Sequence, residues 1–169
     1  MPLLTISKQL LELLRDRLER DIKTFYDGKL DPANIANIDL PVLTVENVSH
    51  ETLKEGEGTV KDNMRWHFRL VLWLDRKMYI DNKTGESEEK NTVREAMEAI
   101  VNGLDVNMDY RTDTIYGVLR KQSNLSIAGK VFYTHSVRTD YEDYIDEKEY
   151  QLAKATIEFD AERRVTRPS

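Results

Sequence analysis

The feature that most constrains the fold is a strict alternation of side chains between residues 64 and 74. Large apolar residues occupy every second position there, namely Met64, Trp66, Phe68, Leu70, Leu72 and Leu74. Such alternation is typical of a β-strand with one face on a core, because successive side chains point to opposite faces of a sheet. The other face starts with charged residues and ends with Val71 and Trp73. We therefore expect a helix, a loop or a neighbouring subunit to cover that apolar end.

Two segments have the three- and four-residue apolar spacing of amphipathic helices. The first is predicted over residues 7–25, with a stripe formed by Leu11, Leu14, Leu18, Ile22 and Phe25 and a stop at Asp27-Gly28. The second is predicted over residues 92–104, where Thr92 and Glu95 form a capping box. Its buried stripe consists of Val93, Ala96, Met97, Ile100, Val101 and Leu104.

Four further strands are predicted over residues 42–48, 115–121, 130–138 and 150–159. The polar run Glu55-Gly56-Glu57-Gly58 is typical of the tip of a long hairpin, and a turn is expected at residues 82–85. Only one connection between strands is helical, which favours an α+β fold. The expected architecture is a mostly antiparallel sheet of about five strands with two helices packed on one face. Residues 1–169 should form a single domain, with a flexible basic C-terminal tail from about residue 162.

Composition and short motifs argue against several classes of function. The net charge of -6 is unfavourable for binding DNA phosphates, and the absence of cysteine excludes disulfides and cysteine-based zinc sites. No apolar run approaches the roughly 18 residues of a membrane span. We find no nucleotide-binding glycine loop and no catalytic constellation, so we expect no enzyme activity, no cofactor and no metal. The three histidines, His50, His67 and His135, have no metal-ligand spacing and are interpreted as satisfied or solvent-facing.

The triplet Asp105-x-Asn107-x-Asp109 resembles the opening of a calcium-binding loop. That motif also needs Gly at its sixth position and Glu at its twelfth, where this chain has Tyr110 and Tyr116. We therefore interpret the triplet as a polar turn after the second helix.

Two charged segments are candidate contact sites between subunits. The first is the acidic stretch of residues 140–149, which is either a solvated loop or a contact, because tyrosine and isoleucine are interleaved with its carboxylates. Its candidate contact residues are Asp140, Tyr141, Glu142, Asp143, Tyr144 and Asp146. The second is the C-terminal tail, either a frayed terminus or a basic arm that pairs with the acidic stretch of another copy. Its candidate contact residues are Arg163, Arg164 and Arg167.

The order of these features resembles that of the tail terminator proteins of long-tailed bacteriophages. The resemblance spans about residues 10–159 and rests on pattern, because no single motif in it is diagnostic. It includes the amphipathic N-terminal helix, the strand entry Leu40-Pro41-Val42-Leu43-Thr44-Val45 and the glycine-containing hairpin. It continues with the strand of residues 66–74, the helix with Ala96-Met97-Glu98-Ala99-Ile100 and the Asp-rich stretch that leads into residues 152–159. The chain is longer than compact members of that family, mainly in residues 75–90 and 120–149.

The resemblance implies a structural virion protein, assembled in the host cytoplasm. Such a protein forms a ring, usually of six copies, that caps the head-proximal end of the tail tube and ends tube polymerisation. Its partners would be itself, the tail tube protein and the head–tail connector or head-closure protein. DNA would pass through the lumen without specific binding, and an acidic protein suits that role.

Two other classes of function stay open at the level of sequence. One is a protein-binding adaptor module or another neck component, such as a head-closure or minor tail protein. The other is an enzyme of a class that lacks short motifs. Self-assembly of the purified protein would separate the ring-forming class from both alternatives.

Overall fold

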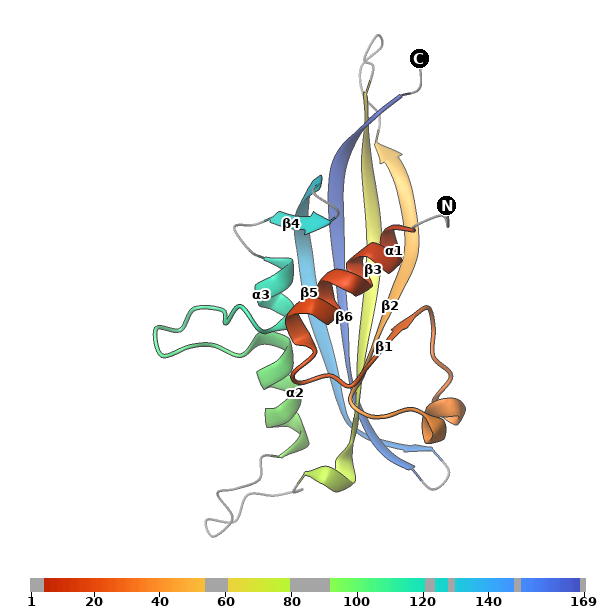
Figure 1. The fold of residues 1–169 in the computed structure, drawn as a ribbon, viewed down its shortest axis with the longest axis vertical. Helices are drawn as coiled ribbons and strands as arrows, with labels where there is room; N and C mark the ends of the chain where they lie inside the picture. Colours follow the sequence, from red (N-terminus) through yellow and green to blue (C-terminus); the bar gives the residue numbers. More distant parts are fainter. Residues whose placement is uncertain are drawn as a thin grey trace.

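The computed structural model describes residues 5–53, 61–79, 92–120, 124–127, 130–147 and 150–167. These residues form one six-stranded sheet in the order β1-β2-β3-β6-β5-β4, with the α-helices on one of its faces (Figure 1). The strands are β1 (Thr24–Asp27), β2 (Val42–Leu53), β3 (Lys61–Asp75), β4 (Asn124–Ile127), β5 (Lys130–Glu147) and β6 (Tyr150–Thr166). The helices are α1 (Ile6–Leu18), η1 (Pro32–Asn37), η2 (Arg76–Met78), α2 (Val93–Asn102) and α3 (Ile115–Leu119).

The sheet is mostly antiparallel, and only β1 pairs with its neighbour, β2, in parallel. The expected α+β class is therefore confirmed. β3, β5 and β6 have 15, 18 and 17 residues, which corresponds to lengths of roughly 50–60 Å. The tip formed by β3 and β6 extends beyond the layer of helices, on the side where the C-terminus lies (Figure 1).

The predicted inner face of β3 lies on the main core. Phe68, Leu70, Leu72 and Leu74 are completely buried against the helices, and the Phe68 ring stacks on Phe159 of β6 at 5.4 Å. The register Phe68↔Phe159 and Leu70↔Ile157 places the apolar positions of the two central strands side by side. The alternation in the sequence therefore identified the strand and its core face correctly.

The segment around η1 covers the apolar end of the other sheet face. Leu30 and Ile35 pack with Val71, Trp73 and Leu152 in a second, smaller cluster. Asp31 begins η1 by accepting a hydrogen bond from the Ala33 backbone N–H at 3.0 Å. We expected a helix, a loop or a neighbouring subunit to cover Val71 and Trp73, and in the structure the loop that contains η1 covers them.

The first helix ends earlier than predicted, at Leu18. Residues 24–27 form β1 instead, with the register Phe25↔Leu43, and the Lys23 and Thr24 N–H groups bond to the Pro41 carbonyl. Aromatic and β-branched residues favour a strand once a neighbouring strand is available. The second helix agrees more closely, because Thr92 caps it through the Glu95 N–H at 3.2 Å and it ends at Asn102.

The strand predicted at residues 115–121 is wrong, because residues 115–119 form α3. Ile115, Val118 and Leu119 are buried at helical spacing, and Thr114 caps the helix by accepting a hydrogen bond from the Gly117 N–H. The structure consequently has one more helix on the core face than predicted. β4 pairs with β5 at the sheet edge and was not predicted.

The C-terminal residues are not the flexible tail that we predicted. β6 continues to Thr166 and pairs with β3 through Met64↔Arg163 and Lys61↔Thr166. The predicted hairpin tip at residues 55–58 and the predicted turn at 82–85 lie outside the described residues, while β2 and β3 do pair as the two arms of a hairpin. None of the described helices has the length and apolarity needed to cross a membrane.

Candidate interaction surfaces

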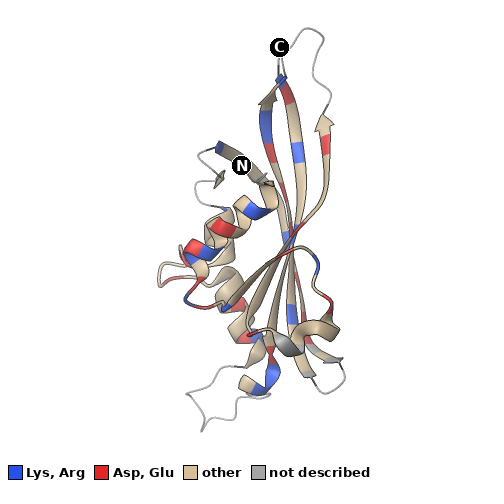
Figure 2. Ribbon diagram, turned by 45° about the vertical axis from the view of Figure 1, so that its right-hand side comes forward, with Lys and Arg blue, Asp and Glu red and all other residues tan. Residues whose placement is uncertain are grey.

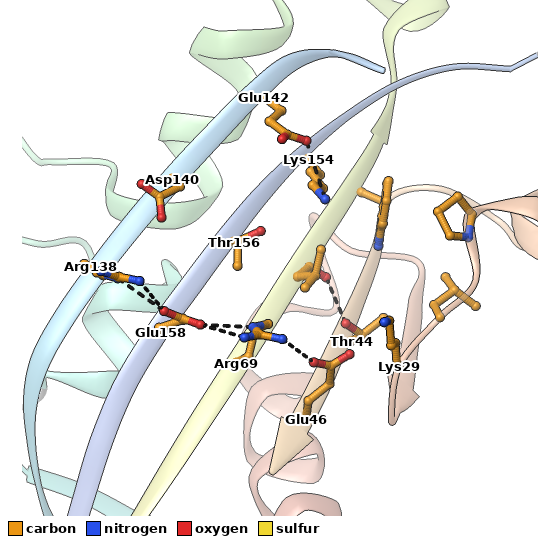
Figure 3. A pocket seen from close by; sticks show the side chains of 14 residues that line it. Lys29, Thr44, Glu46, Arg69, Arg138, Asp140, Glu142, Lys154, Thr156 and Glu158 are labelled. Carbon is orange, nitrogen blue, oxygen red and sulfur yellow. Dashed lines mark hydrogen bonds and ion pairs between the residues drawn. The ribbon is translucent and has the colours of Figure 1, made fainter. Parts of the chain in front are cut away.

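The sheet face opposite the helices, called the open face here, carries ion pairs that cross four strands. Arg69 of β3 lies 3.6 Å from Glu46 of β2 and 3.0 Å from Glu158 of β6. Glu158 is also 2.7 Å from Arg138 of β5 (Figure 3). Acidic residues on β2 and β6 thus alternate with basic residues on β3 and β5, so each charge has an opposite neighbour across the ladder.

A second row of charged and polar contacts crosses the same four strands nearer the tip. Arg65 lies 3.2 Å from Glu51 and 2.7 Å from Glu162, and Glu162 lies 3.5 Å from His135. Between the two rows, the His67 Nδ1 atom is 2.7 Å from Asp160. Most of the charge on the open face is therefore satisfied within one molecule, and His67 and His135 are satisfied as expected.

Glu158 is the central residue of the first row of ion pairs, between Arg69 and Arg138. Its side chain is only 14% exposed and bonds to both Arg138 and Arg69. The hydrogen bond from Arg138, supported by that from Arg69, holds the pKa of the Glu158 carboxyl below its usual value, although burial acts in the opposite direction. The ionised carboxylate is thus the form that the surrounding structure stabilises.

A hollow of about 470 Å³ lies on the open face between the η1 segment and β5 (Figure 3). Leu30, Pro32, Val71 and Trp73 form its apolar side. Lys154 lies 5.3 Å over the Trp73 ring and 3.5 Å from Glu142. Its polar lining consists mostly of residues that are already paired with one another, so the hollow offers few free groups to a ligand.

The acidic stretch forms a strand rather than a loop, because residues 140–147 belong to β5. Asp140 and Glu142 line the hollow on the open face. Tyr141 points to the helix side, where Arg94 of α2 lies 4.6 Å over its ring. Asp143 forms an ion pair with Arg94 at 2.6 Å. Tyr144 and Asp146 lie in the same strand, and their side chains are outside the described part of the structure.

Burial of the Tyr141 side chain raises the pKa of its hydroxyl to about 12. No hydrogen-bond partner for this oxygen occurs among the described residues. Tyr141 therefore packs β5 against the helices, and the subunit contact considered for it from the sequence stays a prediction.

The predicted basic contact residues lie at the other end of the long strands. Arg163 packs 6.0 Å from the Phe132 ring, Arg164 pairs with Asn63 in the ladder, and Arg167 forms an ion pair with Asp62 at 2.8 Å. Figure 2 shows basic positions near the C-terminal tip of the sheet. The acidic candidates lie beside residues 151–156 of β6 and the basic candidates lie at residues 163–167, so within one chain the structure does not bring them together.

A hairpin between α2 and α3, formed by residues 103–114 and called the knob here, was not predicted from the sequence. The Arg111 N–H bonds to the Gly103 carbonyl at 3.1 Å, and Leu104 forms a β-bridge with Tyr110. The Asp105 carboxylate accepts hydrogen bonds from the Asn107 and Asp109 N–H groups at 2.8 and 3.1 Å. The suspected calcium triplet is therefore a polar turn, as interpreted from the sequence. Within the described residues, no cluster of three histidine or acidic side chains could hold a metal ion.

The base of the knob is packed tightly. Thr114 is completely buried and donates a hydrogen bond to the Arg111 carbonyl at 2.8 Å. A Cβ atom on Gly117 would overlap the same carbonyl, so only glycine fits there. The Tyr110 ring contacts the Tyr116 ring edge-on at 5.7 Å. The knob is therefore an ordered projection, even though its apolar tip is in solvent, with Val106 99% and Met108 73% exposed.

Both sides of the sheet have stretches without a neighbouring strand. β1 covers only residues 42–45 of β2, and β4 covers only residues 130–133 of β5. In the described part of the chain, residues 47–53 of β2 and 134–147 of β5 therefore have a strand partner on one side only. Unpaired backbone N–H and C=O groups at such edges can extend a sheet into another chain.

Comparison of the chain with models of known protein families found no match, and neither did comparison with curated proteins.

Proposed function

We propose that this protein is a structural subunit that assembles into a ring at the head-proximal end of a phage tail tube. In this role it ends tube polymerisation and joins the tail to the head connector. The proposal joins the resemblance to tail terminator proteins with the surfaces of the molecule. It requires no catalytic residue, no cofactor and no metal.

The observation that carries the proposal is the pair of unpaired strand edges on opposite sides of one sheet. A ring needs two different complementary surfaces on each subunit, because contacts between identical surfaces close a dimer. Residues 47–53 of β2 and 134–147 of β5 supply two such edges. Backbone hydrogen bonds between the β2 edge of one copy and the β5 edge of the next would continue the sheet around the ring.

The two edges are staggered along the strands. The free part of β2 faces the tip, since Leu53 pairs with Asn63, while the free part of β5 reaches the other end, where Asp146 pairs with Gln151. Edge pairing between copies therefore requires a shift along the strand direction. Strands that tilt relative to the ring axis accommodate such a shift, as they do in a closed barrel.

The open face has the character expected of a surface that lines a DNA channel. Its arginines are engaged by carboxylates on neighbouring strands, as Arg69 is by Glu46 and Glu158. Phosphate binding gains its affinity from the release of counterions by free cationic groups. A face whose cations are already neutralised in this way would let DNA slide past, with the helices on the outside of the ring.

The test is the mass of the purified full-length protein measured by light scattering, followed by negative-stain imaging of any large species. We expect a discrete closed ring with a central hole, most simply of six copies. A monomer at every concentration and salt level would argue against the ring. That outcome would favour an adaptor module that uses the same edges to bind other proteins.

A further inference from the structure

We propose that Asn102 is a site of spontaneous modification, at which the folded chain converts the side-chain amide to aspartate and isoaspartate. Asn102 is the one asparagine in the sequence that precedes a glycine. It is also the last residue of α2, and Gly103 follows it at the base of the knob. The inference concerns a single chain and does not depend on the proposed ring.

The reaction needs only water as a co-reactant. The backbone nitrogen of Gly103 attacks the Asn102 Cγ atom and gives up its proton to the solvent. The Cγ–Nδ2 bond breaks, Nδ2 takes up one proton and leaves as ammonia, and a five-membered succinimide closes. Water then opens this ring at either carbonyl, which yields aspartate or isoaspartate. Glycine favours the attack, because it has no Cβ atom to hinder the approach to its nitrogen.

The attacking nitrogen is free in the structure. The N–H groups that directly follow α1 and α3, on Glu19 and Arg120, bond to carbonyls in the last turns of their helices at 3.1 and 2.8 Å. The Gly103 N–H that follows α2 has no such backbone acceptor among the described residues. In the same part of the chain, the Asn102 side chain has no hydrogen-bond partner either. Neither reacting group therefore has to give up a hydrogen bond before the attack.

The end of α2 requires this pair of residues and permits the reaction. A Cβ atom on Gly103 would lie 2.7 Å from the Ala99 carbonyl oxygen, so glycine is needed where the chain leaves the helix. The attack needs the Asn102 backbone to turn out of its helical conformation. The last residue of a helix does so most readily, because helix ends fray. Asn102 is only half-buried, so water can reach the succinimide.

The modification should loosen the knob. An isoaspartate at position 102 adds one carbon atom to the main chain before Gly103, whose carbonyl accepts the Arg111 N–H at 3.1 Å. It also places a new carboxylate in the hollow that Asn102 and Asp109 line together. Displacement of Gly103 and repulsion between the two carboxylates both weaken the Gly103–Arg111 hydrogen bond.

The test follows the purified full-length protein during incubation at about pH 7 and about pH 9. Peptide mass spectrometry is used with a fragmentation method that distinguishes aspartate from isoaspartate. The peptide that contains Asn102 should gain about 1 Da, and faster at the higher pH, because the Gly103 nitrogen must lose its proton.

Asn107 is a matched control on the same knob. It is exposed, but the Met108 N–H that would attack it bonds to the Asp105 carbonyl at 3.1 Å. Asn107 should stay intact in the folded protein while Asn102 converts. Equal rates at the two positions would overturn the role assigned to the free Gly103 nitrogen.

The same measurement in urea decides whether the folded chain presents the site. Asn102 in the folded protein should convert at a rate within about ten-fold of the rate in urea, because fraying of one helix end costs little free energy. Conversion in urea with an intact Asn102 in the folded protein would show that the helix end protects it, and would overturn the proposal.

Hydrogen exchange tests the consequence for the knob separately. The Arg111 N–H should exchange about ten-fold faster in the aged protein, the effect of losing one ordinary hydrogen bond. Asn102→Gln, whose longer side chain closes a ring far more slowly, should keep both its mass and its exchange rate. If isoaspartate forms and Arg111 exchange is unchanged, the site stands and the loosening of the knob is refuted. The light-scattering test of the ring is independent of these results, so either proposal can fail alone.

Discussion

Two tyrosines on the helix side of β5 place their hydroxyl groups in different surroundings. The Tyr116 hydroxyl lies 2.7 Å from the Thr139 hydroxyl, so it has a hydrogen-bond partner. The Tyr141 hydroxyl is buried without one among the described residues, and burial raises its pKa to about 12. A buried polar group costs free energy when it is unpaired and is close to neutral when it is paired.

The Tyr→Phe substitution should therefore have opposite effects at the two positions. Tyr141→Phe should raise the free energy of unfolding by up to about 1 kcal/mol, since it removes an unsatisfied hydroxyl. Tyr116→Phe should lower it by about 1 kcal/mol, because it leaves the Thr139 hydroxyl without its partner. Denaturant titration of both variants checks the prediction. Equal destabilisation by the two substitutions would show that the Tyr141 hydroxyl has a partner.

Glu158 should make stability depend on pH in the acid range. Its folded pKa lies below the ordinary value, so its stabilising effect is complete above the ordinary pKa and is lost as the pH falls through the folded value. Glu158→Gln should lower the free energy of unfolding at pH 7 by about 1–2 kcal/mol. The difference from wild type should shrink below about pH 4, where the carboxyl becomes protonated.

The matched control for this prediction is Glu12→Gln. Glu12 forms a single exposed pair with Arg15 on α1, at 3.0 Å. Such pairs contribute roughly 0–1 kcal/mol, so the variant should differ little from wild type at any pH. A constant difference between Glu158→Gln and wild type from pH 7 to pH 3 would contradict the assigned pKa direction.

At the scale of elements, the periodicity of apolar residues predicted the long helix and strand whose apolar faces pack in the core. β3 and α2 were predicted because each keeps one period over ten or more residues. α3 was mistaken for a strand because five apolar-rich residues are too few to distinguish the two periods. β1 was missed because its hydrogen bonds go to β2, which lies 15 residues further along the chain and leaves no local signal.

The candidate contact residues were predicted less well than the fold. The acidic stretch and the basic tail were chosen as candidates because of their charge. Their composition did not show that the acidic stretch pairs with β6 and the basic tail with β3 in the sheet. The knob had a usable signal, since Leu104, Val106, Met108 and Tyr110 alternate around the turn-forming Asp105 and Asn107. The triplet was interpreted as a polar turn, and that interpretation did not include the apolar arms on either side of it. The open-face ion pair between Arg69 and Glu158 joins residues 89 positions apart, and no sequence period predicts it.

Removing residues 163–169 should destabilise the protein, because this segment completes the β3–β6 ladder. The truncation deletes the pairing of Arg163 through Thr166 with β3 and the ion pair between Arg167 and Asp62. We expect the free energy of unfolding to fall by about 1–3 kcal/mol, with faster hydrogen exchange in residues 61–64. Deletion of residues 168–169 alone serves as the control. No change on the longer truncation would mean that the segment is a free tail after all.

At the scale of the whole molecule, the long strands differ in charge at their two ends. The tip consists of residues 61–64 of β3 and 163–167 of β6. Its basic residues are Lys61, Arg163, Arg164 and Arg167, and its one acidic residue is Asp62. The opposite end holds the acidic residues of β5. In the staggered ring proposed above, the β2 edge beside the basic tip meets the acidic β5 edge of the next copy. The contact predicted from the sequence between the basic and acidic segments would then occur between chains.

Charge reversal at the tip should therefore weaken ring assembly. β6 lies two strand spacings from the β2 edge, about 10 Å, which is close to the Debye length at 0.1 M salt. The double substitution Arg163→Glu and Arg164→Glu should thus weaken assembly several-fold at low ionic strength and much less at about 0.5 M salt. Arg17→Glu with Arg20→Glu, on exposed positions of the α1 region, controls for net charge alone. Light scattering across a salt series makes the measurement. Equal weakening by both double variants would assign the effect to net charge, and unimpaired assembly of the tip variant would remove the tip from the subunit contact.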